Sequence, residues 1–455
     1  INLNFDNNGK IKDDYEIKGF IKKGKLSLLK NYNIQNLNLL FNIKKNKYIL
    51  EDILTDFNKI KISSPLIKIT EKKNLFLING KLINNKQNID IKLLNNLFVS
   101  DFKDQNIENI NFSTDNDFTF TLSKKLKINN FNLKSIIDLN SLDYKKNSFN
   151  IKKYLPNFKE IIKFKNHKIL ISYSKNQLNI NGKGKIIIEN KPDILDYKIV
   201  KKNDQYIFDA NININKNPLL IDILQYKKKE DVKSLLKLSG IYKKNKQIKF
   251  DSIYLKENNN NILIKNLNLN NKFKITDIKL LDFNYLNTNK IKSQVYLKKN
   301  KKNYKITGKS FDATKLIDEI LNNKDNKKNT SLFNNLNTTI DIDIVKTYLD
   351  NLTFVNNLNG NIVFKNNKIN KLNLDSTFPN DKKIVLTINT NDNNEKITTL
   401  YSNYPKPLLK KYKFIKGFEE GVLDFSSTKK NGISKSFLVI DNFKVQEVPV
   451  LAKLL

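Results

Sequence analysis

Apolar and polar side chains alternate along most of the chain, and this period of two constrains its fold more than any other feature. Between residues 340 and 344, isoleucines alternate with aspartates. Successive side chains of a β-strand point to opposite faces of its sheet, so this pattern predicts a strand with one apolar face. The pattern recurs at residues 1–5, 37–43, 89–93, 118–122, 169–173, 186–188, 212–214, 262–264, 267–269, 362–364 and 384–388. The chain is therefore predicted to be all-β.

Asn-Gly pairs punctuate the predicted strands. They lie at residues 8–9, 79–80, 181–182, 359–360 and 431–432. Both residue types tolerate the positive φ of a type I′ turn, so tight hairpins are expected at several of these pairs. Strands joined in this way form an antiparallel meander. The sequence shows no alternation of strands with long helices, which would indicate a parallel α/β sheet.

Few segments predict a helix. Asp312 suits the N-cap of a short helix over residues 312–321. Pro449 suits the first turn of a second helix that begins over residues 449–455, because the missing N–H of proline would be unpaired there.

We divide the chain into two parts, residues 1–303 and 304–455. Within the second part, two segments interrupt the strand pattern. The polar segment 322–330 predicts a loop, and the two prolines within residues 404–407 exclude a central strand. Residues 48–60 fit a helical and a strand pattern equally, so that segment stays open.

The basic residues are all lysines. They number 82, and the formal net charge is +37. A bias in the base composition of the genome explains the use of lysine alone more simply than selection for binding a ligand does. The charge nevertheless favours anionic surfaces, including acidic lipid head groups. The absence of arginine, the usual bidentate reader of guanine and phosphate, argues against specific nucleic-acid recognition. The chain has no cysteine, and its sequence has no run of about 18 apolar residues that would predict a membrane-spanning helix.

The candidate catalytic and metal-binding residues have simpler interpretations. His167 is the single histidine, which excludes a multi-histidine metal site, and its polar, turn-like surroundings indicate a surface residue. The segment 182–185, Gly-Lys-Gly-Lys, lacks the long loop and helix of a phosphate-binding loop and is interpreted as a hairpin. Asp341 and Asp343 are interpreted as part of a solvated strand face. We therefore predict no catalytic residue, no metal and no cofactor.

The predicted strands each carry an apolar face, but the sequence supplies little helix to cover it. Three arrangements keep such a face dry: two sheets packed as a sandwich, a sheet closed on itself, or a curled open sheet whose trough holds a ligand. From the residues alone, the sandwich is the first expectation.

A motif at the C-terminal end changes that expectation. A glycine-containing strand is followed by Ile-Asp-x-Phe-x-Val and by Pro-x-Leu-Ala-x-Leu-Leu. The motif residues are Gly421, Ile440, Asp441, Phe443, Val445, Pro449, Leu451, Ala452, Leu454 and Leu455. This ending resembles the AsmA-like envelope proteins of Gram-negative bacteria, in particular the YhdP-type branch, which is related to TamB. The resemblance implies an elongated, curled antiparallel β-sheet that forms a hydrophobic groove (a β-taco) with few short helices.

The resemblance also implies a function. Such a groove is expected to conduct phospholipids between the inner and outer membranes, from the periplasm, with an inner-membrane anchor formed by an N-terminal helix upstream of Ile1. Together with the alternation, it predicts that the groove is lined by Ile340, Ile342, Ile362, Phe364, Ile384, Leu386, Ile388, Leu423 and Phe425. The main alternative is a structural or adhesive β-sandwich array without lipid cargo, and a weaker one is a basic nucleic-acid-binding surface.

Overall fold

A computed structural model describes residues 1–28, 32–89, 107–145, 155, 158, 160–244, 246–317, 333, 335–412 and 418–445. Within these residues almost all regular structure is β-strand, which confirms the predicted all-β class. The chain divides into two compact units. Unit 1 comprises Ile1–Leu219 and Lys229–Lys244, and unit 2 comprises Leu220–Lys228 and Asn245–Leu455.

Unit 1 is a run of neighbouring antiparallel strands. They are β1 (Glu16–Leu28), β2 (Tyr32–Lys44), β3 (Lys47–Phe57), β4 (Ile60–Lys72), β5 (Leu75–Asn88), β6 (Ile107–Ser123), β7 (Ile128–Tyr144), β8 (Ile162–Ser174), β9 (Gln177–Ile187), β10 (Pro192–Lys202), β11 (Gln205–Asn213) and β14 (Ser234–Lys243). Each strand pairs with the next one in this order. Between β11 and β14 the chain forms β12 (Leu219–Ile221), the 3-10 helix η2 (Asp222–Leu224) and β13 (Tyr226–Lys228), which from Leu220 on belong to unit 2.

Unit 2 repeats the same plan. Its strands are β15 (Gln247–Glu257), β16 (Asn260–Asn270), β17 (Ile275–Asp277), β18 (Leu280–Leu286), β19 (Lys292–Asn300), β20 (Asn303–Asp312), β21 (Thr338–Tyr348), β22 (Phe354–Lys365), β23 (Lys368–Thr377), β24 (Lys383–Thr390), β25 (Lys396–Ser402), β26 (Phe418–Lys430) and β27 (Ile433–Val445). Helix α3 (Lys406–Tyr412) lies between β25 and β26.

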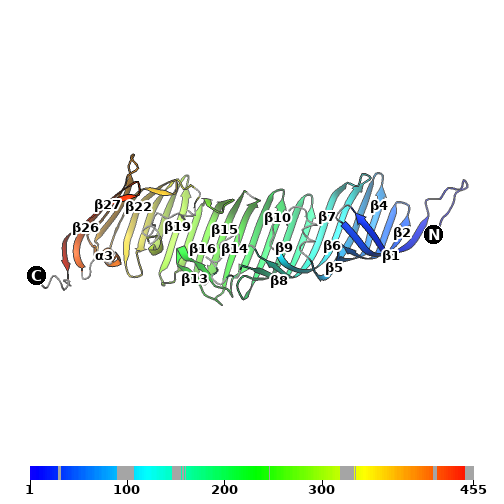
Figure 1. Ribbon diagram of the computed structural model, residues 1–455, viewed down its shortest axis with the longest axis horizontal. Helices are drawn as coiled ribbons and strands as arrows, with labels where there is room; N and C mark the ends of the chain where they lie inside the picture. Colours follow the sequence, from blue (N-terminus) through cyan, green and yellow to red (C-terminus); the bar gives the residue numbers. More distant parts are fainter. Residues whose placement is uncertain are drawn as a thin grey trace. The chain divides into compact units, whose positions relative to one another are not determined.

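The described strands other than β12 and β13 belong to one 25-stranded sheet. Within each unit the strands lie side by side and the sheet curls, as Figure 1 shows, so the predicted curled antiparallel sheet is confirmed. Among the described strand pairs, β20 and β21 alone run parallel. That parallel pair was not predicted.

The hairpin prediction is confirmed at two Asn-Gly pairs and wrong at three. Residues 8–9 lie in a turn, and residues 431–432 join β26 to β27. The pairs at 79–80, 181–182 and 359–360 lie inside β5, β9 and β22. The reason is packing across strands. A Cβ atom on Gly182, for example, would lie 2.2 Å from Cζ of Tyr197 on the neighbouring strand.

The helices correspond in part to the prediction. Residues 314–317 are helical, and the Asp312 Oδ1 atom accepts the expected capping hydrogen bond from the backbone N–H of Thr314 at 3.0 Å. Residues 318–330 and 449–455 lie outside the described residues. The open segment 48–60 is largely strand β3. The proline-containing segment excludes a strand, as predicted, but leads into helix α3, which was not predicted. No helix among the described residues is long and apolar enough to cross a membrane.

Candidate functional site

One face of the sheet in unit 2 is apolar across successive strands. Following directly paired residues from β15 to β27 gives a line of twelve positions, which we call the apolar row. These are Ile253, Ile264, Leu281, Leu297, Ile306, Ile342, Gly360, Leu374, Leu386, Leu400, Phe425 and Leu438. With neighbouring strands about 4.8 Å apart, the row runs for about 50 Å.

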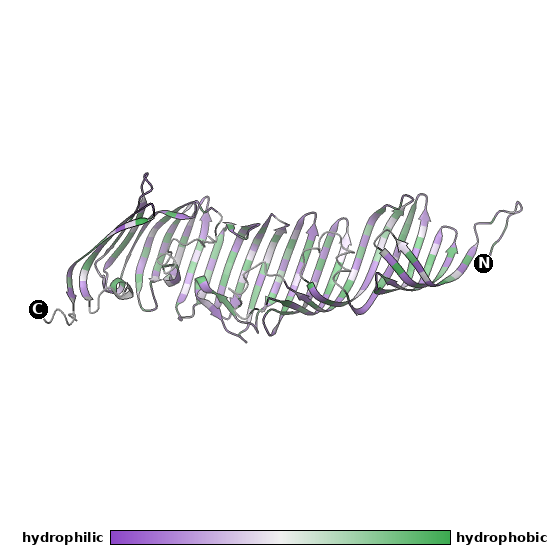
Figure 2. Cartoon of the chain, viewed as in Figure 1, coloured by the Kyte–Doolittle hydropathy of each residue, from purple (hydrophilic) through white to green (hydrophobic). Residues whose placement is uncertain are grey.

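The opposite face is polar at the same level. One residue away on each of these strands lies a second line of paired positions, which we call the polar row. From β16 to β27 it contains Lys265, Leu280, Lys298, Lys305, Asp341, Asn361, Asn373, Thr387, Thr399, Ser426 and Phe437. Figure 2 shows the resulting alternation of hydrophobic and hydrophilic bands along the strands. The strand register therefore separates the two chemistries by face.

The apolar face is largely uncovered. Members of the apolar row are half-buried, except Leu438 on β27, which is 43% exposed. The accessible surface is 29566 Å² for a chain of 53.1 kDa. A compact protein of this mass exposes about 18,000 Å², and two compact bodies of half the mass about 21,000 Å². An open sheet contributes to this excess.

Unit 1 carries a comparable line that is richer in aromatic residues. Its paired positions are Gly19, Phe41, Leu50, Ile67, Gly80, Phe118, Leu133, Tyr173, Leu178, Lys201, Tyr206 and Tyr242. The rings of Tyr206 and Tyr242 lie 5.9 Å apart. The one charged member is Lys201, whose Nζ lies 5.3 Å from the centroid of the Tyr206 ring. The apolar face thus recurs in each unit.

The nine predicted groove-lining residues share the face of the apolar row. Ile342, Leu386 and Phe425 belong to the row itself, and Ile340 pairs directly with Ile362. The remaining four are Phe364, Ile384, Ile388 and Leu423, which the register places on the same side of β22, β24 and β26. Ile388 and Leu423 are buried and the others are half-buried.

Helix α3 covers this face near the last strands. Its Leu409 and the Leu423 of β26 are 2% and 3% exposed and form one apolar cluster, against which Leu400, Phe425 and Ile440 pack. One predicted groove residue, Leu423, therefore packs against a helix, and Phe425 packs against the same cluster. The sequence signal for this helix was weak: two leucines follow Pro407, and proline fits a first helical turn.

Charged groups lie beside the apolar face at the ends of β17 and β19. The Nζ of Lys299 lies 2.5 Å from Oδ1 of Asp277, and the Tyr304 hydroxyl donates to the same oxygen at 3.4 Å. Burial, with the charge of Asp277 adding to it, raises the pKa of Tyr304 to about 12. These residues line a cavity of about 190 Å³ together with Lys302 and Thr338. The site combines a cation and hydrogen-bond donors with an adjacent apolar cluster around Leu267, Ile278 and Tyr304.

The interpretation of His167 as a surface residue is wrong. Its side chain is 1% exposed in the middle of β8. The His167 ring lies 5.5 Å from the ring of Phe164 and 6.0 Å from the ring of Tyr197. It also lies over Gly184, where a larger side chain would collide with the imidazole. Nε2 lies 3.0 Å from the carbonyl oxygen of Lys185, while Nδ1 is buried without a hydrogen-bond partner. Burial lowers the pKa of His167 below its ordinary value despite that hydrogen bond.

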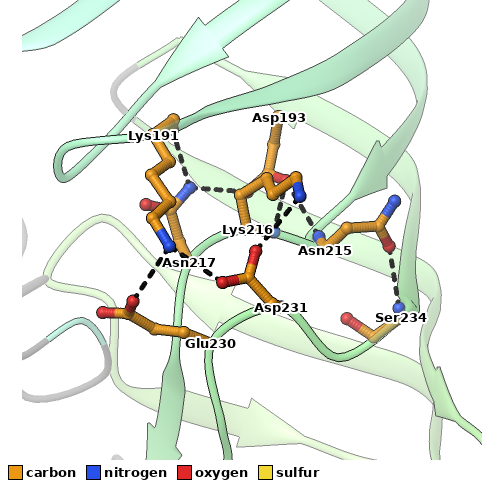
Figure 3. Close-up of polar contacts among 8 residues, drawn as sticks. All are labelled: Lys191, Asp193, Asn215, Lys216, Asn217, Glu230, Asp231 and Ser234. Carbon is orange, nitrogen blue, oxygen red and sulfur yellow. Dashed lines mark hydrogen bonds and ion pairs between the residues drawn. The ribbon is translucent and has the colours of Figure 1, made fainter.

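A buried carboxylate anchors the excursion between β11 and β14 (Figure 3). Asp193 of β10 is 3% exposed. Its Oδ1 accepts hydrogen bonds from the backbone N–H groups of Asn215 and Lys216 at 2.8 and 2.9 Å, and its Oδ2 accepts one from Nδ2 of Asn217 at 2.6 Å. Sequence analysis did not single out Asp193, because its partners follow it by more than twenty residues and no local pattern joins them.

A cluster of ion pairs surrounds that anchor. Asp231 accepts from Nζ of Lys191 at 2.9 Å and from Nζ of Lys216 at 3.1 Å, and Lys191 also contacts Glu230 at 3.2 Å. The hydrogen bonds from Lys191 and Lys216 lower the pKa of the Asp231 carboxyl. With its carboxylates already paired to lysines, the cluster has the form of a loop anchor.

The other sequence candidates lie where they have no evident chemistry. The segment 182–185 is part of strand β9 and not a hairpin, because Gly184 supports the ring of His167 and Gly182 that of Tyr197. Asp341 and Asp343 are exposed on the polar face, and Asp341 lies opposite Lys305 in the register of β20 and β21. No group of three or more metal-ligating side chains occurs among the described residues.

The motif residues at the C-terminal end are described in part. Gly421 has φ +96, and a Cβ atom there would lie 3.0 Å from the carbonyl oxygen of Asp441 on β27. Asp441 and Phe443 are exposed on β27. Pro449 and Leu451 lie outside the described residues.

Comparison with known proteins adds no family. No model of a protein family matches the chain, and no curated protein is significantly similar to it. The argument for function therefore depends on the geometry of the apolar face.

Proposed function

We propose that this protein carries phospholipids between the inner and outer membranes of a Gram-negative envelope, with their acyl chains on the apolar face of its curled sheet. The observation that supports the proposal is the apolar row, which crosses twelve strands of unit 2 and is half-buried along most of its length. Among the described residues, helix α3 and the two-stranded sheet β12–β13 cover parts of the same face, the latter through Tyr226 on Tyr285 of β18. The proposed location is the periplasm, with an inner-membrane anchor upstream of Ile1.

The energetic argument concerns the cost of moving acyl chains through water. Exposing each CH₂ group costs about 0.8 kcal/mol, so a two-chain phospholipid faces a barrier on the order of 20 kcal/mol. A continuous apolar lining removes most of that cost at each step. Because contacts with isoleucine, leucine and phenylalanine are non-directional, the lipid can slide along them. In this mechanism no residue is catalytic.

The head group requires a different environment. Phospholipid phosphates are anionic, and the protein carries a net charge of +37. Lys302, in the turn between β19 and β20, lies beside the apolar face at the ends of these strands. Acyl chains on one face and phosphates at the solvent-accessible margin therefore both find favourable surroundings.

Lipid bound to the purified protein tests the proposal. Mass spectrometry of an organic extract of the purified chain should detect phospholipid at a stoichiometry of one or more per protein. A lipid-free, stable protein would contradict lipid carriage and favour a structural or adhesive role.

The face that contacts lipid is tested with a photoreactive amino acid. Placed at Ile342 or Leu386 on the apolar face, it should crosslink phospholipid at least fivefold more than at Val345 or Ile397. The latter two lie on the polar face of β21 and β25 and are 56% and 37% exposed, which makes them accessible controls. Equal labelling of both faces would contradict the proposal.

A further inference from the structure

Strand β27 is an apolar sheet edge. Among the described residues, β26 is its one strand partner, and from Ile433 to Asn442 its other side faces no further described strand. Its central residues are exposed on both faces: Phe437 is 71%, Leu438 43% and Val439 51% exposed. Phe437 is also one of the two apolar members of the polar row. Figure 1 shows β27 as the last strand of unit 2.

The edge at β1 is built differently. Lys18, Lys22 and Lys25 lie along that strand, and its register with β2 shifts twice between Ile21 and Leu26. Lysines and bulges are common devices that keep a sheet edge from pairing with another chain. In β27 the segment from Phe437 to Ile440 has no charged residue and pairs with β26 without a shift. The contrast indicates that the β27 edge accepts a further strand.

The sequence of β27 is complementary to itself. In an antiparallel pair centred on Leu438, residues whose numbers sum to 876 lie opposite each other. Lys435 then faces Asp441, and by symmetry the same ion pair forms twice. Phe437 faces Val439, and Ile433 faces Phe443. Within the described residues of one chain, neither Lys435 nor Asp441 forms an ion pair.

Neighbouring registers lose this match. Centring the pair on Val439 sets Phe437 against Asp441 and Lys435 against Phe443. Centring it on Phe437 sets Lys435 against Val439 and Ile433 against Asp441. Each alternative places a charged residue opposite an apolar one. Register along β27 is therefore specified by its side chains.

We propose that β27 pairs antiparallel with β27 of a second copy of this chain, about a two-fold axis at Leu438. In this pair even-numbered residues face even-numbered ones, so the two sheets join with their apolar faces on the same side. Leu438 of one copy lies beside Leu438 of the other, and the apolar row continues from one chain into the next. The pairing depends on strand chemistry and not on lipid.

Charge exchange tests the pairing in the full chain. Analytical ultracentrifugation should show a concentration-dependent dimer. Lys435→Asp and Asp441→Lys should each weaken dimerisation at least tenfold, because two like-charged pairs then face each other, and the double exchange should restore it to within threefold. Both positions are exposed, so folding is preserved. A monomer at all concentrations, or a dimer that is indifferent to the exchanges, would overturn the proposal.

Cysteine crosslinking tests the register. The chain has no cysteine, so Leu438→Cys introduces a single thiol that meets its own copy at the axis. Directly opposed residues have Cα atoms about 4.5–5.5 Å apart, within disulfide range. Mild oxidation should give a covalent dimer with Leu438→Cys but not with Ile433→Cys, which is more exposed at 70%. Equal crosslinking of the two variants would overturn this register.

A monomeric chain whose β27 amides are protected from hydrogen exchange by an added apolar peptide would overturn the dimer and assign the edge to a different partner. These readouts involve no lipid, so their failure would leave lipid carriage standing.

Discussion

His167 is a titratable residue inside an apolar strand face, and its protonation should affect stability. Well above pH 6.5, from about pH 7.5, the imidazole is almost entirely neutral in both the folded and the unfolded chain. Because burial lowers its pKa in the folded protein, the unfolded chain binds the proton first as the pH falls. The folded state should therefore lose stability below about pH 6.5, by at most about 1.4 kcal/mol for each pH unit. Urea unfolding midpoints between pH 8 and pH 5 measure this loss.

The matched variant for this experiment is His167→Gln. Glutamine does not titrate and can still donate a hydrogen bond to the carbonyl oxygen of Lys185. Since His167 is the single histidine, the stability difference between the two proteins isolates its contribution. The difference in unfolding free energy between the two proteins should be constant above pH 7. Below pH 6.5 the wild type should lose stability relative to His167→Gln. A difference independent of pH would show that the imidazole does not titrate differently in the folded state.

The misjudged position of His167 shows what alternation does and does not predict at single residues. Its neighbours Asn166 and Lys168 are exposed, and the register of β8 with β9 shifts between Lys165 and Lys168. Sequence analysis took this irregular, polar segment for a turn. Burial depends on Gly184 and Tyr197, which lie on β9 and β10. Alternation thus predicts which residues share a face, but the cross-strand neighbours that bury one of them are set by register.

Among the elements, the excursion between β11 and β14 depends on one carboxylate. Asp193→Ala would remove the acceptor of three hydrogen bonds from residues 215–217. The N–H of Asn215 and Nδ2 of Asn217 also donate to the carbonyl oxygens of Asn213 and Lys191, so they keep one acceptor each. Hydrogen bonds to a charged group contribute roughly 1.5–3 kcal/mol each, so with two donors partly compensated we expect a destabilisation of about 3 kcal/mol. Hydrogen exchange should show faster exchange of the Asn215 and Lys216 amides.

A control for this prediction lies on the same strand. Asp196 is exposed on the opposite face of β10, so Asp196→Ala should leave exchange at Asn215 and Lys216 unchanged. Asp193→Asn retains one oxygen acceptor and should give an intermediate effect. If the Asn215 and Lys216 amides exchange at the same rate in Asp193→Ala and Asp196→Ala, the Asp193 carboxylate does not hold the excursion in place.

The elements also differ in how far sequence predicts them. Strands such as β21 and β24 follow directly from alternation. The parallel pairing of β20 with β21 does not, because alternation carries no information on the relative direction of two strands. The Asn-Gly pair at 359–360 suggested a turn, yet Gly360 is a member of the apolar row. A Cβ atom there would lie 1.9 Å from the carbonyl oxygen of Asn373, so the close approach of β23 requires glycine.

At the level of the whole chain, charge and apolar surface are separate properties with separate roles. The net charge of +37 comes from lysines, many of them on the polar face, and acts through solvent over about 8–10 Å at moderate ionic strength. Contact between acyl chains and the apolar face is short-ranged and insensitive to salt. The two contributions can therefore be distinguished by ionic strength.

Membrane association should respond to salt while lipid contact on the apolar face should not. Co-sedimentation with vesicles that contain anionic phospholipid should fall at least tenfold between 50 and 500 mM NaCl, because each lysine near the surface contributes about 1 kcal/mol that screening removes. Zwitterionic vesicles, the control, should bind weakly at both concentrations. Over the same range, lipid crosslinking from residue 342 in lipid-loaded protein should change by less than twofold. If crosslinking falls in parallel with vesicle binding, the lipid is held by charge and the apolar row is not its binding surface.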